Sequence, residues 1–302
     1  MTITITGAGG FLGQRVTKLL AERGEKLVLA DLVPPPDPPS GATVLQGNLA
    51  ETLNDAITPE TTAVIHLAAV VSAGAEADFE HGYRVNLTGL RSVLERCRQL
   101  GTNPKFLFTS SLAVFGAVER VDDDTATMPQ SSYGTQKALG ELLVNDYSRK
   151  GYIQGRTLRL PTVVIRPGKP NAAASSFASG ILREPLAGEK SICPVSPDLA
   201  LWIASPASVT TALVHALDMD DAAFAPWRVL NVPGITVTVA QMVEALGRAG
   251  GDPSLVEFQY DPAIDAIVGS WPAQFVTPRA DAMGFPPADD LDTLIQSHIN
   301  GL

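Results

Sequence analysis

The stretch Thr6-Gly7-Ala8-Gly9-Gly10-Phe11-Leu12-Gly13 connects an alternating run of β-branched residues to a helical pattern. Residues 2–6 are typical of a strand, and the helical pattern over residues 11–23 stops at Gly24. In such a unit the first glycine makes a tight turn, the second lets the backbone approach a pyrophosphate, and the third lets the helix pack on the strand. The helix N-terminus then offers free N–H groups and a partial positive charge. The stretch therefore predicts a dinucleotide site that includes Gly7, Gly10, Phe11, Leu12 and Gly13.

The next strand adds an acidic residue to this pattern. Residues 26–31 are largely apolar and end in Asp31, roughly 20 residues beyond the glycines, where a dinucleotide-binding unit places a carboxylate for the ribose. The alternative is a plain strand–turn–helix unit that uses the same glycines without a ligand. Because a carboxylate repels a 2′-phosphate, and no arginine follows directly at Leu32 and Val33, the sequence predicts NAD in preference to NADP.

The composition restricts the class of protein. The chain has 302 residues, of which 45% are hydrophobic, and its formal net charge is −10. The negative charge argues against nucleic acid and anionic membranes as partners. The two cysteines, Cys97 and Cys193, argue against a disulfide scaffold and for the reducing cytoplasm. The N-terminus lacks a signal-peptide pattern, and the most apolar stretch, residues 64–71, is too short to cross a bilayer.

Strand and helix patterns alternate from residue 1 to about residue 165. Such alternation predicts an α/β fold with a Rossmann-type, doubly wound parallel sheet and helices on both faces. We expect an NAD-binding Rossmann domain over residues 1–165 and a smaller C-terminal α/β substrate lobe over residues 166–302, with the option that some of its strands return to the main sheet. The expected strands cover residues 26–31, 42–46, 63–71, 105–109, 156–165, 228–232 and 256–260, and the expected helices cover residues 11–23, 76–100, 131–150, 172–186, 205–217, 239–248 and 289–299.

A tyrosine and a lysine, Tyr133 and Lys137, stand four positions apart in the helical pattern of residues 131–150 and therefore share one helix face. A free tyrosine, with a pKa of about 10, is a poor base at neutral pH, but a nearby lysine and a nicotinium charge favour the phenolate. Ser111, at the end of the preceding strand, can hydrogen-bond the same alcohol oxygen. The pattern predicts proton transfer to or from an alcohol, and its alternative is a surface pair that merely touches.

Two other polar features are interpreted as structural. His66 lies inside an apolar strand and is more typical of a hydrogen-bonded core residue than of a catalytic base. The acidic run of residues 122–124 lacks the oxygen-rich loop spacing of a cation site, and no cluster of Cys, His and Asp has the spacing of metal ligands. We therefore expect no metal.

Taken in order, these motifs resemble the extended short-chain dehydrogenase/reductase family, the NAD-dependent epimerases and dehydratases. The resemblance covers about the first 165 residues and rests on Gly7-x-x-Gly10-x-x-Gly13, Asp31, His66-Leu67-Ala68-Ala69, Asn86, Ser110-Ser111-x-x-Val114-Phe115-Gly116 and Tyr133-x-x-x-Lys137. Family dehydratases carry an Asp-Glu pair after the Ser/Thr. Because this sequence has Leu112 and Ala113 there, water elimination is not expected.

The resemblance implies a role for each matching residue. Tyr133 is the proton acceptor or donor, Lys137 binds the nicotinamide ribose and tunes Tyr133, and Ser111 orients the substrate oxygen. Asp31 binds the adenosine ribose, and Asn86 supports the helix of the Tyr/Lys pair or a bound water. The residues implied to line the rest of the dinucleotide are Asn48 and Leu49 at the adenine, Ala68, Ala69 and Val70 along its length, and Pro161, Thr162 and Val163 at the nicotinamide.

Residues 166–186 are unlike a nucleotide-sugar site and resemble a subgroup of the family that oxidises C2 of a four-carbon sugar acid, D-erythronate, to a 2-oxo-tetronate with NAD. The small and hydroxyl-bearing side chains of residues 172–177 suit a compact polyol. A carboxylate needs a local cation in a chain of net charge −10, and arginine can bind it bidentately. Arg183 is the favoured cation, with Arg166 and Lys169 as alternatives. The predicted substrate contacts are Ser72, Ser111, Tyr133, Asn171, Ser175 and Arg183.

The leading hypothesis is thus an NAD-dependent sugar-acid dehydrogenase. A nucleotide-sugar 4-epimerase, which uses the same residues but retains its cofactor, is the runner-up, and a non-catalytic NAD-binding sensor or scaffold is the alternative of another class. Relatives pair two helices across a two-fold axis, so the resemblance implies a homodimer through residues 76–100 and 131–150. The expected partners are a small sugar acid and a second copy of the chain.

Overall fold

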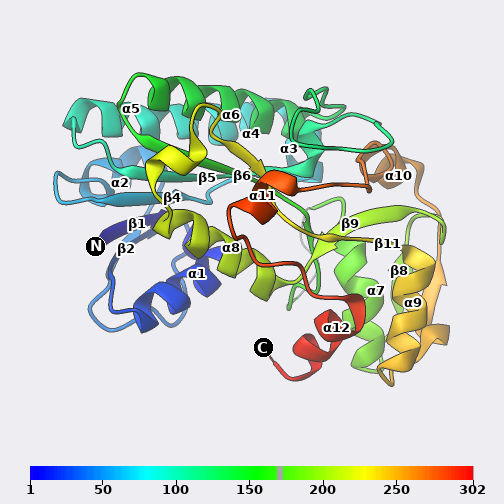
Figure 1. Ribbon diagram of the computed structural model, residues 1–302. Helices are drawn as coiled ribbons and strands as arrows, with labels where there is room; N and C mark the ends of the chain where they lie inside the picture. The colour runs from blue at the N-terminus through cyan, green and yellow to red at the C-terminus, as the bar shows by residue number, and fades with distance from the viewer. Residues whose placement is uncertain (169–172, 302) are drawn as a thin grey trace.

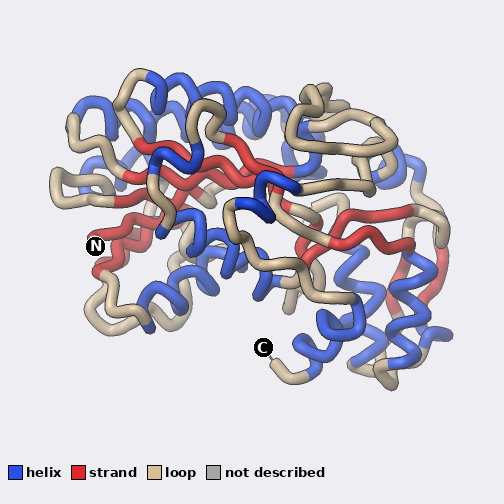
Figure 2. The backbone as a smooth tube through the Cα atoms, in the orientation of Figure 1, coloured by secondary structure: helices blue, strands red, loops and turns tan. Residues whose placement is uncertain are grey.

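The computed structural model describes residues 1–168 and 173–301, and its centre is a parallel sheet of seven strands. In chain order these are β1 (Thr2–Thr6), β2 (Lys26–Asp31), β3 (Thr43–Gln46), β4 (Ala63–His66), β5 (Lys105–Ser111), β6 (Gln154–Leu160) and β10 (Val229–Asn231). Their order across the sheet is β10-β6-β5-β4-β1-β2-β3. From β1 the chain adds β2 and β3 on one side and then crosses over to add β4 and its successors on the other, so the strand order reverses between β1 and β4. Figure 2 shows the strands in red. The predicted doubly wound α/β fold is confirmed, and the reversal is where such sheets bind ligands.

Helices cover both faces of this sheet (Figure 1). α1 (Phe11–Glu22) and α8 (Pro206–Asp218) pack on one face through an apolar cluster with β1 and β2. The other face is covered by α2 (Leu49–Ala56), α5 (Leu90–Leu100) and α6 (Ser132–Arg149). Both faces of the central strands are therefore removed from water, which explains their nearly continuous apolar sequences.

The helices end and begin close to the glycine and serine residues from which their termini were predicted. Gly24 and Gly101 adopt left-handed conformations, with φ angles of 74° and 67°, just past the ends of α1 and α5. The Ser131 hydroxyl accepts a hydrogen bond from the Gly134 N–H (3.1 Å) and caps α6. α2 was not predicted; Asn48 caps it by accepting a hydrogen bond from Ala50 N–H (3.2 Å).

The single helix predicted over residues 76–100 is wrong. The segment instead forms α3 (Ser72–Ala77), α4 (Phe79–Tyr83), the π-helical segment η1 (Arg84–Gly89) and then α5. Asp78 breaks the run because its backbone is not helical and its carboxylate accepts a hydrogen bond from His81 N–H, which starts a new helix (2.9 Å). Apolar residues keep a helical spacing through all four segments, so the sequence pattern could not reveal where one segment ends and the next begins.

Two predicted strands end five residues earlier in the structure than expected. The strand expected over residues 63–71 ends at His66, and the one expected over residues 156–165 ends at Leu160. Pro161 follows β6 and cannot donate a hydrogen bond to a ladder. The chain then enters β7 (Thr162–Val163), which belongs to a separate three-stranded sheet with β9 (Ala200–Ala204) and β11 (Ile235–Thr238).

Apart from α8 and β10, much of the chain after residue 165 lies beside the carboxyl edge of the main sheet (Figure 1). Its helices bury a cluster of small and aliphatic side chains against β9 and β11. The predicted helix of residues 239–248 is confirmed, and the helix predicted over residues 172–186 starts at Ser176. The remaining elements are α7 (Ser176–Leu186), β8 (Ser191–Cys193), α9 (Val239–Arg248), β12 (Val256–Phe258), α10 (Pro262–Val268), α11 (Pro278–Ala282), α12 (Leu291–Ile299) and the 3-10 turns η2 (Leu112–Val114), η3 (Asp221–Phe224) and η4 (Pro253–Leu255).

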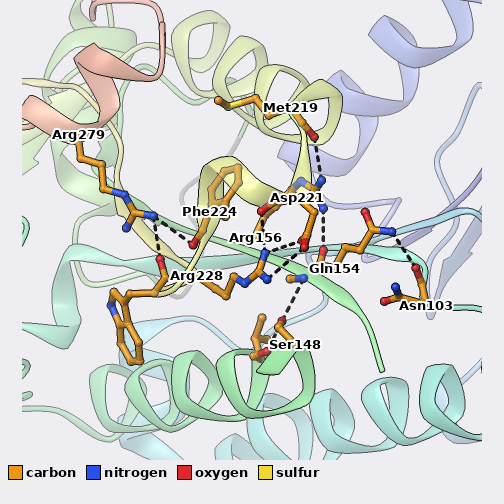
Figure 3. Close-up of polar contacts among 12 residues, drawn as sticks. Asn103, Ser148, Gln154, Arg156, Met219, Asp221, Phe224, Arg228 and Arg279 are labelled. Carbon is orange, nitrogen blue, oxygen red and sulfur yellow. Dashed lines mark hydrogen bonds and ion pairs between the residues drawn. The ribbon is translucent and has the colours of Figure 1, made fainter. Parts of the chain in front are cut away.

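The second half of the chain also completes the main sheet, because β10 pairs with β6 at its edge. Figure 3 shows the contacts that fix this edge. Arg156 of β6 is fully buried and donates to the carbonyls of Gln154 (2.7 Å) and Met219 (2.8 Å). Arg279 of α11 donates to the carbonyl of Trp227 (2.9 Å). Two arginines thus tie the segment before β10 to the sheet and to the C-terminal helices.

A buried ion pair connects α6 to β6 behind the carboxyl end of β5. Arg159 donates two hydrogen bonds to the carboxylate of Glu141, at 2.8 and 2.7 Å, and Ser110 donates a third at 2.6 Å. The two charged side chains are only 5% and 2% exposed. Because each charge has lost its water, each depends on the other.

We expect Glu141→Ala to lower the free energy of unfolding by about 3–5 kcal/mol, since it leaves the Arg159 guanidinium buried without a counter-charge. Asp146→Ala, five positions further along the same helix, breaks an exposed pair with Arg149 and is expected to cost less than about 1 kcal/mol. Urea denaturation of both variants measures the difference. Equal losses would contradict the role given to the buried pair.

Candidate active site

A cavity of about 320 Å³ lies at the carboxyl ends of the central strands and brings most of the predicted site residues together. The predicted residues that line it are Gly7, Gly10, Phe11, Leu12, Gly13, Ala69, Ser72, Ser111, Tyr133, Lys137, Pro161, Thr162, Val163 and Ser175. Of the predicted residues that the structure describes, those outside the lining are Asp31, Asn48, Leu49, Ala68, Val70, Asn86 and Arg183. Asn171 and the alternative cation Lys169 lie outside the described residues.

The glycine loop after β1 is packed too closely for most side chains. Gly7 has a φ of 76°, and a Cβ there would lie 2.5 Å from the backbone nitrogen of Ala68. A Cβ on Gly13 would lie 2.2 Å from the carbonyl oxygen of Gly7. Gly10, by contrast, is exposed and caps α1 without a side-chain hydrogen bond. The first N–H groups of α1 therefore have no side-chain cap at Gly10, and they suit a phosphate anion.

Asp31 ends β2 beside this loop. Its carboxylate accepts hydrogen bonds from the backbone N–H groups of Gly9 (2.8 Å) and Val33 (3.1 Å), which fix its position. Asn48 and Leu49 follow β3, the neighbouring strand on the same edge of the sheet. A helix N-terminus and a fixed carboxylate at the end of the next strand are the two features that a bound NAD requires, so these residues fit the predicted cofactor.

Tyr133, Lys137 and Ser111 converge in the cavity, as their spacing predicted. α6 starts after Ser131 and presents Tyr133 and Lys137 one turn apart. The Lys137 ammonium donates to the carbonyl of Thr109 (2.9 Å) and lies 5.6 Å from the centre of the Tyr133 ring. Burial lowers the pKa of Lys137 to about 8, against the opposing effect of the Glu141 carboxylate.

The acidity of Tyr133 differs from the expectation. Burial raises the pKa of its phenol to about 12, although the positive charge of Arg166 and a hydrogen bond with Ser111 both act to lower it. The loss of hydration thus outweighs the combined effect of Arg166 and Ser111. The sequence pattern had pointed to Lys137 rather than to Arg166 as the neighbouring charge.

Asn86 acts on the site through its neighbours. In η1 its side chain accepts a hydrogen bond from Val70 N–H (2.8 Å) and donates to Val70 O (2.9 Å) and to Gln136 Oε1 (2.7 Å). Gln136 lies between Tyr133 and Lys137 on α6. Asn86 thereby joins the loop after β4 to the helix of the Tyr/Lys pair, and the supporting role that the resemblance implied stays a prediction.

His66 is a core residue. It is 2% exposed, and its Nδ1 lies 2.7 Å from the hydroxyl of Thr6 on the neighbouring strand. Burial and the positive charge of Lys137 lower the pKa of His66 to about 3. The imidazole is therefore neutral and hydrogen-bonded inside the sheet, as the sequence predicted.

Arg166 lines the cavity together with Lys137 and adds a second basic side chain to it. Its backbone N–H donates to Ser179 Oγ (3.0 Å), and its carbonyl accepts a hydrogen bond from Arg183 Nη1 (2.5 Å). Arg183, the cation favoured from sequence, forms an ion pair with Glu184 (2.5 Å) and does not line the cavity. α7 starts at Ser176, four residues later than predicted.

The cavity also contains lining residues that the sequence did not indicate. Most of them neighbour predicted ones, namely Leu67, Val71, Thr109, Ser110, Leu112, Leu160 and Ala173. Trp271 is different, because it lies about 100 residues after the other lining residues and carries no motif. Only the packing of the C-terminal layer brings it to the site.

Two further observations concern the described part of the chain. Within residues 1–168 and 173–301, no group of three or more His, Cys, Asp or Glu residues is arranged to hold a metal ion. No helix in those ranges is both long enough and apolar enough to cross a membrane.

Comparison with known proteins agrees with this geometry. The chain is 47% identical to a D-erythronate dehydrogenase of Cupriavidus necator, over 99% of this chain and 98% of that protein. It is 46% identical to a D-erythronate dehydrogenase of Haemophilus influenzae, over 99% of both chains. The crystal structure of a nucleoside-diphosphate-sugar epimerase from Agrobacterium tumefaciens superposes with a TM-score of 0.91, at 39% identity, over 99% of this chain and 94% of that chain.

The family model of the NAD dependent epimerase/dehydratase family matches residues 3–234. That range contains the glycine loop, Asp31, the Ser/Tyr/Lys set and β10, which closes the sheet. The chain therefore belongs to the NAD dependent epimerase/dehydratase family.

Proposed function

We propose that this protein is an NAD-dependent dehydrogenase that oxidises the C2 hydroxyl of a small sugar acid, D-erythronate, to the 2-oxo acid. The observation that carries the proposal is the position of Arg166 in the cavity, close enough to Tyr133 for its charge to act on the phenol. In a 2-hydroxy acid the carboxylate is bonded to the carbon that bears the reacting hydroxyl. A guanidinium beside the proton acceptor thus suits such an acid. The two relatives named D-erythronate dehydrogenase support the same substrate.

In the proposed reaction the Tyr133 phenolate accepts the proton of the C2 hydroxyl, while the hydrogen on C2 leaves with its electron pair. C2 thereby becomes a carbonyl carbon. Bound NAD supplies the hydride acceptor. Ser111 hydrogen-bonds the C2 oxygen, and the Lys137 ammonium, held by the carbonyl of Thr109, favours the phenolate.

The cofactor contacts follow the same assignment. Gly7, Gly10 and Gly13 with Phe11 and Leu12 would hold the pyrophosphate, and Asp31 would hold the adenosine ribose. Residues 1–165 would bind the dinucleotide, and residues 166–302 would contribute the substrate end of the cavity. The remaining proposed contacts are Asn48 and Leu49 at the adenine, Ala68, Ala69, Val70 and the positioning residue Asn86 along the cofactor, Pro161, Thr162 and Val163 at the nicotinamide, and Ser72 and Ser175 at the substrate, with Asn171 a sequence-based candidate.

A substrate screen tests the proposal. NADH formation is measured with D-erythronate, threonate, uronic acids and UDP-sugars under identical conditions. We expect D-erythronate to give the highest kcat/KM. Turnover of a UDP-sugar alone would overturn the substrate and the roles given to Arg166 and Ser175.

A nucleotide-sugar 4-epimerase is the second candidate, favoured by the name of the Agrobacterium structure. An epimerase returns the hydride to its substrate and so releases no net NADH. Absorbance spectra of the purified protein separate the two, because an epimerase would retain a reduced cofactor. A non-catalytic sensor would bind NAD without turnover of any of these substrates.

We expect kcat/KM to be at least about tenfold higher with NAD than with NADP, since about 1.4 kcal/mol of repulsion between Asp31 and a 2′-phosphate gives that factor. Initial rates with each cofactor measure the ratio. Asp31→Ser is the matched variant, and it should bring the two values closer. An equal or higher kcat/KM with NADP in the unaltered protein would contradict the role of Asp31.

We also propose a homodimer in which α5 and α6 of each copy meet. Leu139 and Leu142 support it, since they are 36% and 56% exposed on α6 and form an apolar patch. Sedimentation should show a dimer that Leu142→Glu converts to a monomer, whereas Ile192→Glu, at an exposed position on β8, leaves the dimer intact. A monomeric unaltered protein would contradict this assembly.

The proposed setting is the cytoplasm. Cys97 and Cys193 support it, because both are buried and neither forms a disulfide.

A further inference from the structure

Trp271 is the largest side chain that the C-terminal part of the chain contributes to the cavity. The other lining residues after residue 165 are Arg166, Ala173 and Ser175. Ser72, which also lines the cavity, is close to this group because its hydroxyl accepts a hydrogen bond from Ala174 N–H (2.9 Å). Apart from Arg166, these neighbours are small, so the indole is the bulkiest feature of this part of the wall.

The indole nitrogen of Trp271 is buried and has no hydrogen-bond partner among the residues that the structure describes. An unpaired buried N–H costs about 1–3 kcal/mol, and buried tryptophans usually find a partner for this group. Unpaired buried polar groups are rare in native structures, and each one needs a structural or functional explanation. Because the ring lines a cavity, an acceptor on a bound molecule would satisfy it.

The segment that carries Trp271 is held in place at several points. Thr236 donates to the carbonyl of Ala273 (2.6 Å), and Val121 donates to the carbonyl of Gln274 (2.8 Å). Next in the chain, Phe275 stacks on Trp202 with ring centres 4.9 Å apart. These contacts join the segment to β9, to β11 and to the loop after β5. Trp271 is thus part of a fixed wall, and a fixed wall can select substrates by length.

We propose that Trp271 is a specificity-determining residue, whose indole limits the length of the sugar acid and whose Nε1–H donates a hydrogen bond to its terminal hydroxyl. The inference rests on the proposed function. With the carboxylate at Arg166 and the C2 hydroxyl at Tyr133, one end of the acid is fixed. C3 and C4 then extend from that end, and the proposal pairs the terminal C4 hydroxyl with the unpaired indole donor in the C-terminal part of the wall.

Two variants separate the parts of this proposal. Trp271→Phe keeps an aromatic wall but removes the N–H donor, and Trp271→Ala removes both. Each is assayed with D-erythronate, with its 4-deoxy analogue 2,3-dihydroxybutanoate, and with five-carbon aldonates. Trp227→Phe is the matched control, because that tryptophan is 38% exposed and does not line the cavity. The Kd for NAD is measured for every variant.

We expect Trp271→Phe to lower kcat/KM about tenfold for D-erythronate but not for the 4-deoxy analogue, since only the former has the hydroxyl to lose. Trp271→Ala should raise the ratio of kcat/KM for five-carbon over four-carbon acids by about tenfold. The Kd for NAD and the Trp227→Phe control should stay at the unaltered values.

An unchanged preference between D-erythronate and its 4-deoxy analogue in Trp271→Phe would overturn the hydrogen bond. An unchanged length preference in Trp271→Ala would overturn the wall, provided the variant still binds NAD. If Trp271→Ala does not fold, Trp271→Leu tests the same length preference. Failure of the unaltered protein to oxidise any sugar acid would overturn the proposed function itself, and this outcome is seen before any variant is made.

Discussion

Tyr133→Phe is expected to reduce the rate of D-erythronate oxidation by about 10²–10⁴-fold, the usual contribution of a positioned general base. The substitution removes one oxygen atom and leaves the ring, so the cavity keeps its shape. In the proposed function Tyr133 acts on the substrate proton and the glycine loop and Asp31 hold the dinucleotide, so the Kd for NAD should be nearly unchanged. Single-turnover NADH formation and NAD titration measure the two quantities separately.

The matched control is Tyr147→Phe on the same helix. Its hydroxyl bonds Glu95 at 3.3 Å and lies outside the cavity lining, so kcat should not change. A Tyr133→Phe protein with activity within tenfold of the unaltered one would remove Tyr133 from the proton-transfer step.

Arg166→Gln is expected to raise the KM for D-erythronate about 30- to 10³-fold, which corresponds to a loss of about 2–4 kcal/mol from a charged pair. Glutamine can still donate a hydrogen bond, so the loss reports on the charge. The Kd for NAD should be retained. Arg149→Gln, on the exposed end of α6, is the control and should leave the KM unchanged. A KM within a few-fold of the unaltered value would show that another cation binds the carboxylate.

The same variant has an expected signature in the pH profile. The positive charge of Arg166 acts to lower the pKa of Tyr133. Oxidation needs the phenolate, so the rate rises as the pH rises through the pKa of this group. Without the charge that pKa is higher, and the rise should move to higher pH in Arg166→Gln. Arg166→Lys keeps the charge and should move it less. A purely structural role of Arg166 would change the rate without this displacement.

The turns, helix ends and helix-face neighbours could be predicted from the sequence, because short stretches of sequence determine them. Gly7 specifies a tight turn, Gly10 leaves the start of the helix open, and Gly13 allows the helix to approach the turn closely. Gly24, Gly101 and Ser131 mark helix ends through their own backbone or side-chain preferences. The Tyr133/Lys137 pair follows from the helix period alone. Each of these features depends on neighbours within about one helical turn.

The rest could not be predicted because it depends on contacts between distant segments. The π segment Arg84–Gly89 continues the apolar period of a helix, and its residue Asn86 bonds Val70 and Gln136, which are 16 and 50 positions away. Arg166 lines the cavity, whereas Arg183 contacts the Arg166 carbonyl and Glu184, and the first of these contacts joins residues 17 positions apart. Trp271 reaches the cavity because its loop is bonded to Val121 and Thr236, which no local pattern encodes.

The pairing of β6 with β10 has a consequence during synthesis of the chain. β6 ends at Leu160, whereas β10 starts at Val229. At translation rates of about 5–20 residues per second, the partner strand leaves the ribosome about 4–14 seconds after β6. During that interval the edge of β6 is unpaired in the nascent protein. Arg156, which is buried in the folded protein, then lacks the Met219 carbonyl as its hydrogen-bond acceptor. An exposed edge of this kind can pair with another chain, so this interval is when the nascent protein is most prone to aggregate and most dependent on chaperones.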